Sequence, residues 1–165
     1  QAAQIDAPLS IVNKRRLEQL STHLLLKKIR PNTSIHYNSF GAPKTNTIEN
    51  ISISHTNEKV AIIISKHKVG VDIEKISSRA LKVSEKFMDK SVYNKLCKNK
   101  ATLIWSAKEA IYKWHEKGCV NFLKDIIIED FNAYQKGSLI ANFQNKKLIL
   151  NYKKINNHYL VYICN

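Results

Sequence analysis

Two short segments carry side chains whose types and spacing could perform chemistry. Residues 70–74 read Gly-Val-Asp-Ile-Glu, and residues 105–113 read Trp-Ser-Ala-Lys-Glu-Ala-Ile-Tyr-Lys. In a strand, Asp72 and Glu74 at i and i+2 lie on one face. In a helix, the glutamate and the last lysine of the second segment, four residues apart, also share a face. Three acids and one cation that converge would suit a metal-assisted reaction of a phosphate-bearing substrate.

Each of these signals also has an ordinary structural interpretation. Carboxylates about 7 Å apart along a strand repel by roughly 2–3 kcal/mol at an effective dielectric constant of about 20. A divalent cation such as Mg²⁺ or Mn²⁺ would reverse that penalty, but pairing with a lysine such as Lys75 would also reduce it. Glu109 and Lys113 form the favourable helical pair, worth about 0.2–0.5 kcal/mol. His55, at the end of an alternating segment, is either a hydrogen-bonded structural residue or a donor to a phosphate oxygen.

Composition favours an ordered domain with a polyanionic partner. The chain has 165 residues, is 44% apolar and carries a formal charge of +14. This length is most economically one domain with its own core. The charge favours nucleic acid, an anionic membrane, an acidic protein or a multiply phosphorylated small molecule as partner, unless it reflects only a lysine-rich surface. The dispersed lysines argue against a disordered basic tail.

The remaining bulk features favour a protein of the cytoplasm without a membrane anchor. No apolar run approaches the roughly 20 residues that span a bilayer. The opening residues lack the basic and apolar regions of a signal peptide, so we expect none. The three cysteines, Cys97, Cys119 and Cys164, show no CxxC spacing, which predicts idle or buried thiols in a reducing compartment and no zinc site.

Periodicity predicts a helix, then strands, then helices, then strands. Helices are expected over 13–28, with Asn13 as N-cap, and over 80–97 and 101–116. Strands are expected over 33–37, 51–54, 60–65, 69–73, 126–128, 139–143, 147–151 and 158–163. We expect the β-branched run 60–65 to be buried on both faces and to form a hairpin with 69–73. Segregated elements of this kind favour an α+β fold.

In this order, the motifs resemble those of the surfactin-type (Sfp-type) 4′-phosphopantetheinyl transferases, in the holo-acyl-carrier-protein synthase superfamily. The family has a Gly-x-Pro turn, a strand ending in Ser-His, a Gly-[Val/Ile]-Asp-x-Glu strand and a Trp-[Ser/Cys]-x-Lys-Glu-[Ala/Ser]-x-x-Lys helix. The corresponding segments here are 41–43, 51–55, 70–74 and 105–113. The resemblance covers about residues 14–131.

The resemblance implies roles for individual residues. Asp72, Glu74 and Glu109 would bind Mg²⁺ or Mn²⁺, and Glu109 would be the general base. The coenzyme A site would be formed by Arg15, Gly41, Ala42, Pro43, Ser54, His55, Asp72, Lys108 and Lys113. Lys113 would contact the phosphates and assist catalysis, and the turn 41–43 would line the adenine end.

The resemblance also implies an architecture and a reaction. Two similar lobes, about 1–74 and 75–165, would be related by a pseudo-twofold, each with a helix on a small, mostly antiparallel sheet. A monomeric enzyme would transfer 4′-phosphopantetheine from coenzyme A to a serine of an acidic acyl or peptidyl carrier protein, releasing adenosine 3′,5′-bisphosphate. Neither nucleic acid nor a membrane would be a partner.

Three departures leave alternatives open. Ala42 stands where the family commonly has lysine, His23 where arginine is usual, and Val92 at an often acidic position. An inactive relative that binds coenzyme A or a carrier protein is one alternative. A basic nucleic-acid-binding module is another, although the sequence shows no recognised module of that kind.

Overall fold

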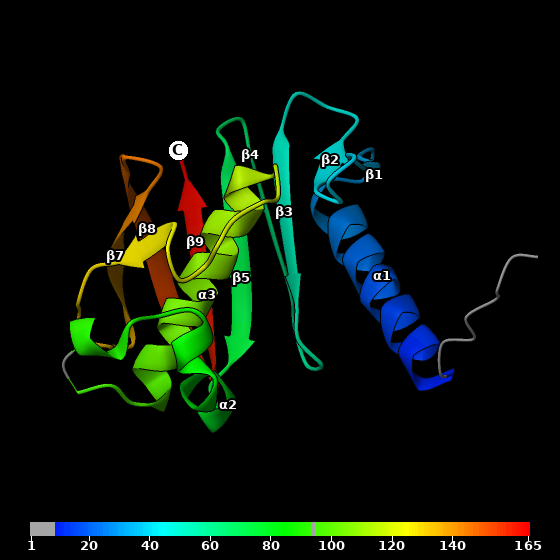
Figure 1. Ribbon diagram of the computed structural model, residues 1–165. Helices are drawn as coiled ribbons and strands as arrows, with labels where there is room; N and C mark the ends of the chain where they lie inside the picture. The colour runs from blue at the N-terminus through cyan, green and yellow to red at the C-terminus, as the bar shows by residue number, and fades with distance from the viewer. Residues whose placement is uncertain (1–8, 94) are drawn as a thin grey trace, which may run out of the picture.

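Strands from the second half of the chain, joined by β5, form a five-stranded antiparallel sheet with the order β5-β9-β8-β7-β6. The computed structural model describes residues 9–93 and 95–165 (Figure 1). The sheet strands are β5 (Val69–Lys75), β6 (Ile126–Ile128), β7 (Lys136–Phe143), β8 (Lys146–Ile155) and β9 (His158–Cys164). The α+β class expected from the order of elements is confirmed.

The long helix α3 (Lys98–His115) crosses one face of this sheet (Figure 1). Leu103, Ile104 and Ile111 recur at helical spacing and are fully buried against the strands. Burial of side chains of this size contributes about 1.5–3 kcal/mol each. At Gly70 on β5, a Cβ atom would lie only 2.0 Å from the Ala110 carbonyl oxygen, so the glycine of the 70–74 motif lets α3 approach β5 closely.

The first half of the chain contributes a helix and two separate hairpins. These are α1 (Leu9–Ile29), β1 (Ile35–Tyr37), β2 (Pro43–Thr45), β3 (Asn50–His55) and β4 (Val60–Ser65). The strands pair only as β1-β2 and β3-β4, both antiparallel. The pseudo-twofold relation between the halves and the lobe boundary near residue 74 stay predictions, and β5, on the near side of that boundary, belongs to the sheet of the second half.

Serine side chains connect the two halves. β3 lies beside β5 without a backbone ladder between them (Figure 1). Instead, the Val71 N–H donates to Ser52 Oγ at 3.0 Å, and the Ile73 N–H donates to Ser54 Oγ at 3.2 Å. These bonds satisfy buried donors of β5, as a buried backbone requires.

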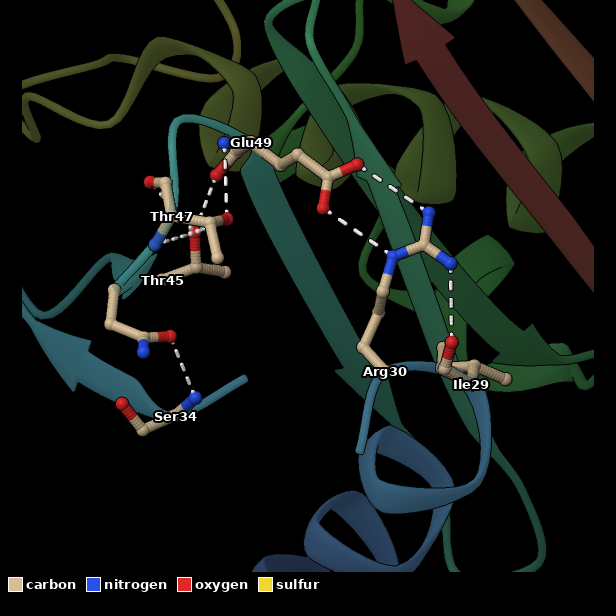
Figure 2. A network of polar contacts seen from close by, with 7 residues as sticks. Ile29, Arg30, Ser34, Thr45, Thr47 and Glu49 are labelled. Carbon is tan, nitrogen blue, oxygen red and sulfur yellow. Dashed lines mark hydrogen bonds and ion pairs between the residues drawn. The ribbon is translucent and has the colours of Figure 1, made fainter. Parts of the chain in front are cut away.

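The end of α1 is fixed by a polar network (Figure 2). The guanidinium of Arg30 contacts both oxygens of Glu49 at 3.4 Å and donates to the Ile29 carbonyl at 3.1 Å. Thr45 Oγ1 donates to the Glu49 carbonyl at 2.6 Å, which fixes the segment leading into β3. The pair therefore orients α1 relative to β3.

Four expectations about local structure are wrong. Asn13 lies inside α1 rather than at its start. The run 60–65 is only partly buried, because β4 pairs with β3 alone and is an edge strand. It forms no hairpin with 69–75, which pairs with β9.

The expected helix over 80–97 is also wrong. The chain forms only α2 (Ser78–Lys82) and two 3₁₀ turns, η1 (Ser84–Lys86) and η2 (Lys90–Val92). The Asp89 carboxylate accepts the Ser91 N–H at 2.9 Å, and such a local bond competes with helix propagation.

Two expectations about composition can be compared with the structure. The three cysteines are free, as expected, and all are exposed rather than buried. In the described part of the chain no helix is long and apolar enough to cross a membrane.

Candidate functional site

Asp72 lies at the meeting point of β3, β5 and α3. It is 3% exposed, and each of its carboxylate oxygens accepts hydrogen bonds. Ser54 Oγ and Lys113 Nζ contact Oδ1 at 2.8 and 2.7 Å, and Ser106 Oγ donates to Oδ2 at 2.7 Å. Lys113 Nζ also donates to Ser54 Oγ at 2.9 Å. The structure therefore brings together a strand acid and a helix cation that are 41 residues apart.

Burial and the charge of Asp72 raise the pKa of both glutamates of the expected site, Glu74 and Glu109. Burial, and secondarily the Asp72 charge, raises the pKa of Glu74, whose carboxylate accepts a hydrogen bond from Trp105 Nε1 at 3.2 Å. The pKa of Glu109 is raised to about 7, mainly by burial and also by the charges of Asp72 and Glu74, while the charge of Lys113 opposes them. The three carboxylates expected to converge thus influence one another electrostatically.

The arrangement has the donor chemistry of a magnesium site but not its geometry. Carboxylate oxygens are the ligands that Mg²⁺ and Mn²⁺ prefer. Among residues 9–93 and 95–165, however, no group of three His, Cys, Asp or Glu side chains is arranged to hold a metal ion. The ammonium of Lys113 is the cation at Asp72 in this structure. A divalent ion would fit these residues only if Lys113 turned away from Asp72.

Three adjoining cavities lie along this part of the molecule, and Glu109 lines two of them. The central cavity, about 290 Å³, is lined by Gly41, Ala42, Pro43, His55, Glu109 and Lys113 among others. The Trp105 cavity, about 610 Å³, is lined by Glu74, Trp105, Phe87 and Phe122, with Lys75, Arg79 and Lys86, and it shares Glu109 with the central cavity. The α1 cavity, also about 610 Å³, is lined by Arg15, His23 and Lys27 and shares Tyr37 and His55 with the central cavity. Together they form an extended site with Glu109 between two of its parts.

The α1 side of this site is held by hydrogen bonds to His55. Thr22 Oγ1 lies 2.6 Å from His55 Nε2 and donates to the Glu18 carbonyl at 2.8 Å. Because the Thr22 hydroxyl donates its proton to the Glu18 carbonyl, it must accept in its bond with His55. We therefore place the proton of that bond on Nε2 of His55. Burial lowers the pKa of His55. Arg15 and His23 line the α1 cavity. Arg15 is the basic residue expected near the nucleotide, and His23 stands where the family usually has arginine.

The turn at 41–43 is fixed by local polar contacts, and its Ala42 leaves it without the lysine that the family commonly has. Gly41 has φ +77°, which glycine adopts without strain, and Asn38 Oδ1 accepts the N–H of Ala42 at 2.9 Å. Lys44 does not replace the cation missing at position 42, because its ammonium is paired with Glu116 at 2.6 Å. That pair joins the hairpin β1-β2 to the end of α3.

Three of the expected coenzyme A ligands, Ser54, Asp72 and Lys108, line none of the three cavities, and one contact was not anticipated. Lys108 is buried on another side of α3, donating to backbone carbonyls. Ser106, by contrast, holds Asp72. Its position seven residues before Lys113, two helical turns on the same face, is the sequence signal that could have identified it. The side chain of Val92 lies outside the described residues.

Comparison with known proteins identifies the superfamily of the chain. The 4′-phosphopantetheinyl transferase superfamily matches residues 68–164, so the chain belongs to that superfamily. A relative described as 4′-phosphopantetheinyl transferase gsp, from Aneurinibacillus migulanus, is 33% identical over 97 residues. The match covers 53% of this chain and 41% of the relative, so the chain spans well under two thirds of that protein. The turn 41–43 and His55 lie outside the matched region of the superfamily.

The raised pKa of Glu109 gives a testable effect on stability. Its ordinary value is 4.5 and the folded value is about 7, so folding disfavours the carboxylate form. The stability that the protonated form provides is complete below pH 4.5 and is lost as the pH rises through 7. In metal-free protein, Glu109→Gln should therefore be more stable than wild type at pH 8 by about 2–3 kcal/mol, and equally stable at pH 4.

Urea unfolding at intervals between pH 4 and 8, with EDTA present, measures this difference. Equal pH dependence of the two proteins would show that Glu109 is not disfavoured as a carboxylate in the fold.

Proposed function

We propose that the protein transfers 4′-phosphopantetheine from coenzyme A to a serine hydroxyl of an acyl or peptidyl carrier protein. One observation carries the proposal: in a member of this superfamily, Glu109 lies between two cavities, next to Asp72 and Lys113. A donor in one cavity and an acceptor entering from the other would meet at that carboxylate. The lining of these cavities by Glu74, His55 and Lys113 supports the proposal, whereas Ser54, Asp72 and Lys108 line none of them.

The donor would lie along the α1 and central cavities. Arg15, Lys27 and His55 offer cationic or donor groups for phosphate oxygens, and the turn 41–43 offers a wall for the adenine end. An extended molecule such as coenzyme A would place its pyrophosphate near Lys113 and its pantetheine arm toward Glu109. The excess of 14 positive charges would steer both a polyanionic donor and an acidic carrier protein toward the enzyme.

The chain's own residues account for the proton and charge movements. The serine hydroxyl oxygen forms a bond to the β-phosphorus of the donor, and the bond from that phosphorus to the bridging oxygen breaks. Glu109, in its carboxylate form, accepts the serine proton. Lys113 offsets the charge on the departing adenosine 3′,5′-bisphosphate. A Mg²⁺ or Mn²⁺ ion held by Asp72, Glu74 and Glu109 would act as a Lewis acid toward the pyrophosphate.

Mass spectrometry of the carrier protein tests the proposal. Incubation of the protein with an apo carrier, coenzyme A and Mg²⁺ should add one phosphopantetheine arm to one serine. A carrier with that serine changed to alanine, and a reaction with EDTA, are the controls. Binding of coenzyme A without transfer would favour an inactive relative, and a gel shift with a steep salt dependence would favour a nucleic-acid-binding module. We further propose that the protein acts as a monomer in the cytoplasm.

A further inference from the structure

A buried lysine on α3 is not used by the chemistry proposed above. Lys108 is 1% exposed, and its ammonium donates to the Phe122 carbonyl at 2.5 Å and to the Ile126 carbonyl. Burial lowers the pKa of Lys108 to about 8, so the group is still charged at neutral pH. A buried ammonium is costly unless acceptors surround it, and here the acceptors are backbone carbonyls of one connecting segment.

That segment, residues 119–125, is the part of the connection between α3 and β6 that leads directly into β6. It closes on itself through the Asn121 N–H, which donates to Asp125 Oδ2 at 2.7 Å, and through the Asp125 N–H, which donates to the Asn121 carbonyl at 2.8 Å. Apart from these internal bonds, Lys108 ties the segment to α3 at Phe122 and at its junction with β6. The lysine therefore sets where the segment lies on the helix.

Phe122 is the part of this segment that faces the site. Its ring centroid lies 5.5 Å from that of Trp105 and 5.7 Å from that of Tyr112, both on α3. The ring centroid of Phe87 lies 5.1 Å from that of Trp105, in an edge-to-face arrangement. Trp105 thus contacts two phenylalanine rings, and such ring pairs stabilise a fold beyond the apolar area that they bury. The indole N–H of Trp105 then reaches the Glu74 carboxylate.

We propose that Lys108 is a positioning residue: by holding the Phe122 and Ile126 carbonyls it fixes the Phe122 ring against Trp105, and through the indole N–H it orients Glu74. Lys108 itself lines none of the three cavities. The inference rests on the proposed function only where it predicts an effect on transfer. A lysine that served local stability alone would leave the indole of Trp105 unaffected when it was replaced.

The first test reads the indole directly, without substrate. Lys108→Met keeps most of the apolar stem and removes the ammonium. In ¹⁵N-labelled protein we expect the Trp105 indole resonance to shift and the amides of 119–125 to exchange at least tenfold faster with solvent. The resonance of Trp114, the other tryptophan, is the internal reference.

Lys100→Met is the matched control. Lys100 is a second buried lysine on the same helix, 4% exposed, and it pairs with Asp130, which lies outside segment 119–125. Its replacement should lower stability without moving the Trp105 indole or speeding exchange in 119–125. An unchanged indole in Lys108→Met, or equal changes in both variants, would overturn the proposal.

Phe122→Ala keeps the proposal testable if Lys108→Met fails to fold. It removes the ring while Lys108 stays in place, so the Trp105 indole should shift as in the lysine variant. An indole that keeps its resonance in Phe122→Ala would break the postulated chain of contacts at its second step and overturn the proposal.

Transfer kinetics complete the test. Each single variant should lower kcat/KM for phosphopantetheine transfer about tenfold, and the double variant should be no worse than either, because both act through one path. Multiplicative losses, or no loss alongside a shifted indole, would refute the positioning role. If wild type transferred nothing, the proposed function would fail, while the indole and exchange data would still decide whether Lys108 positions Trp105.

Discussion

Asp72→Asn is expected to lower kcat/KM for phosphopantetheine transfer by roughly 10³-fold or more while the protein stays folded. The amide removes the negative charge that pairs with Lys113 and that would be the central ligand of the proposed divalent ion. It keeps the size of the side chain, and its oxygen can still accept from Ser54 Oγ. The amide nitrogen can donate to Ser106 Oγ, whose hydroxyl can accept as well as donate. The change is therefore directed at charge and not at packing.

The measurement is the initial rate of carrier modification by mass spectrometry, at several coenzyme A concentrations. Circular dichroism and the unfolding midpoint show whether the variant is folded. Glu129→Gln is the matched control, because it neutralises a carboxylate that pairs with Lys147 at 3.2 Å on the surface. That control should transfer at the wild-type rate. A folded Asp72→Asn protein with an undiminished rate would remove Asp72 from the site.

The parts of the fold that sequence could predict are those governed by local periodicity. Apolar residues at helical spacing, such as Leu103 and Ile111, were sufficient to predict α3, because one face of a helix must be buried. Strand pairing was not predictable in the same way. The three residues between β4 and β5 favour a hairpin, but β5 instead pairs with β9, whose residues lie about ninety positions later. Such a pairing is decided by the packing of α3 across the sheet, which Gly70 permits.

In the site, too, the sequence could predict what depends on local spacing but not what depends on long-range contacts. Acids and a cation at strand and helix spacing indicated that Asp72, Glu74, Glu109 and Lys113 share faces, and the structure places them together. The role of Lys108 could not be read from spacing, since its partners are carbonyls that 14 and 18 residues of chain separate from it. Nor could the sequence show that the Lys113 ammonium pairs with the Asp72 carboxylate. Whether that carboxylate binds the ammonium or a divalent ion depends on which cation is present.

Lys113→Met is expected to have opposite effects on metal binding and on transfer. In this structure the ammonium donates to Asp72 Oδ1 at 2.7 Å, so a divalent ion at Asp72 must displace it and then lie close to its positive charge. Methionine removes both obstacles and keeps most of the length of the side chain. Without coenzyme A, the variant should bind Mn²⁺ about tenfold more tightly than wild type, a change of roughly 1.4 kcal/mol.

Transfer by the same variant should fall by roughly 10²-fold or more, because no cation then offsets the charge of the departing bisphosphate. Mn²⁺ affinity can be measured by electron paramagnetic resonance or calorimetry in nucleotide-free protein, and transfer by mass spectrometry. Lys147→Met, which removes an exposed lysine, is the control for net charge and should change neither quantity by more than about twofold. Weaker Mn²⁺ binding by Lys113→Met would mean that the ammonium does not compete with the metal, and that the ion, if it binds, does so away from Asp72. Tighter Mn²⁺ binding together with lost transfer would mean that Lys113 has two successive partners. It would pair with Asp72 before the metal ion and coenzyme A bind, and with the phosphates of coenzyme A afterwards.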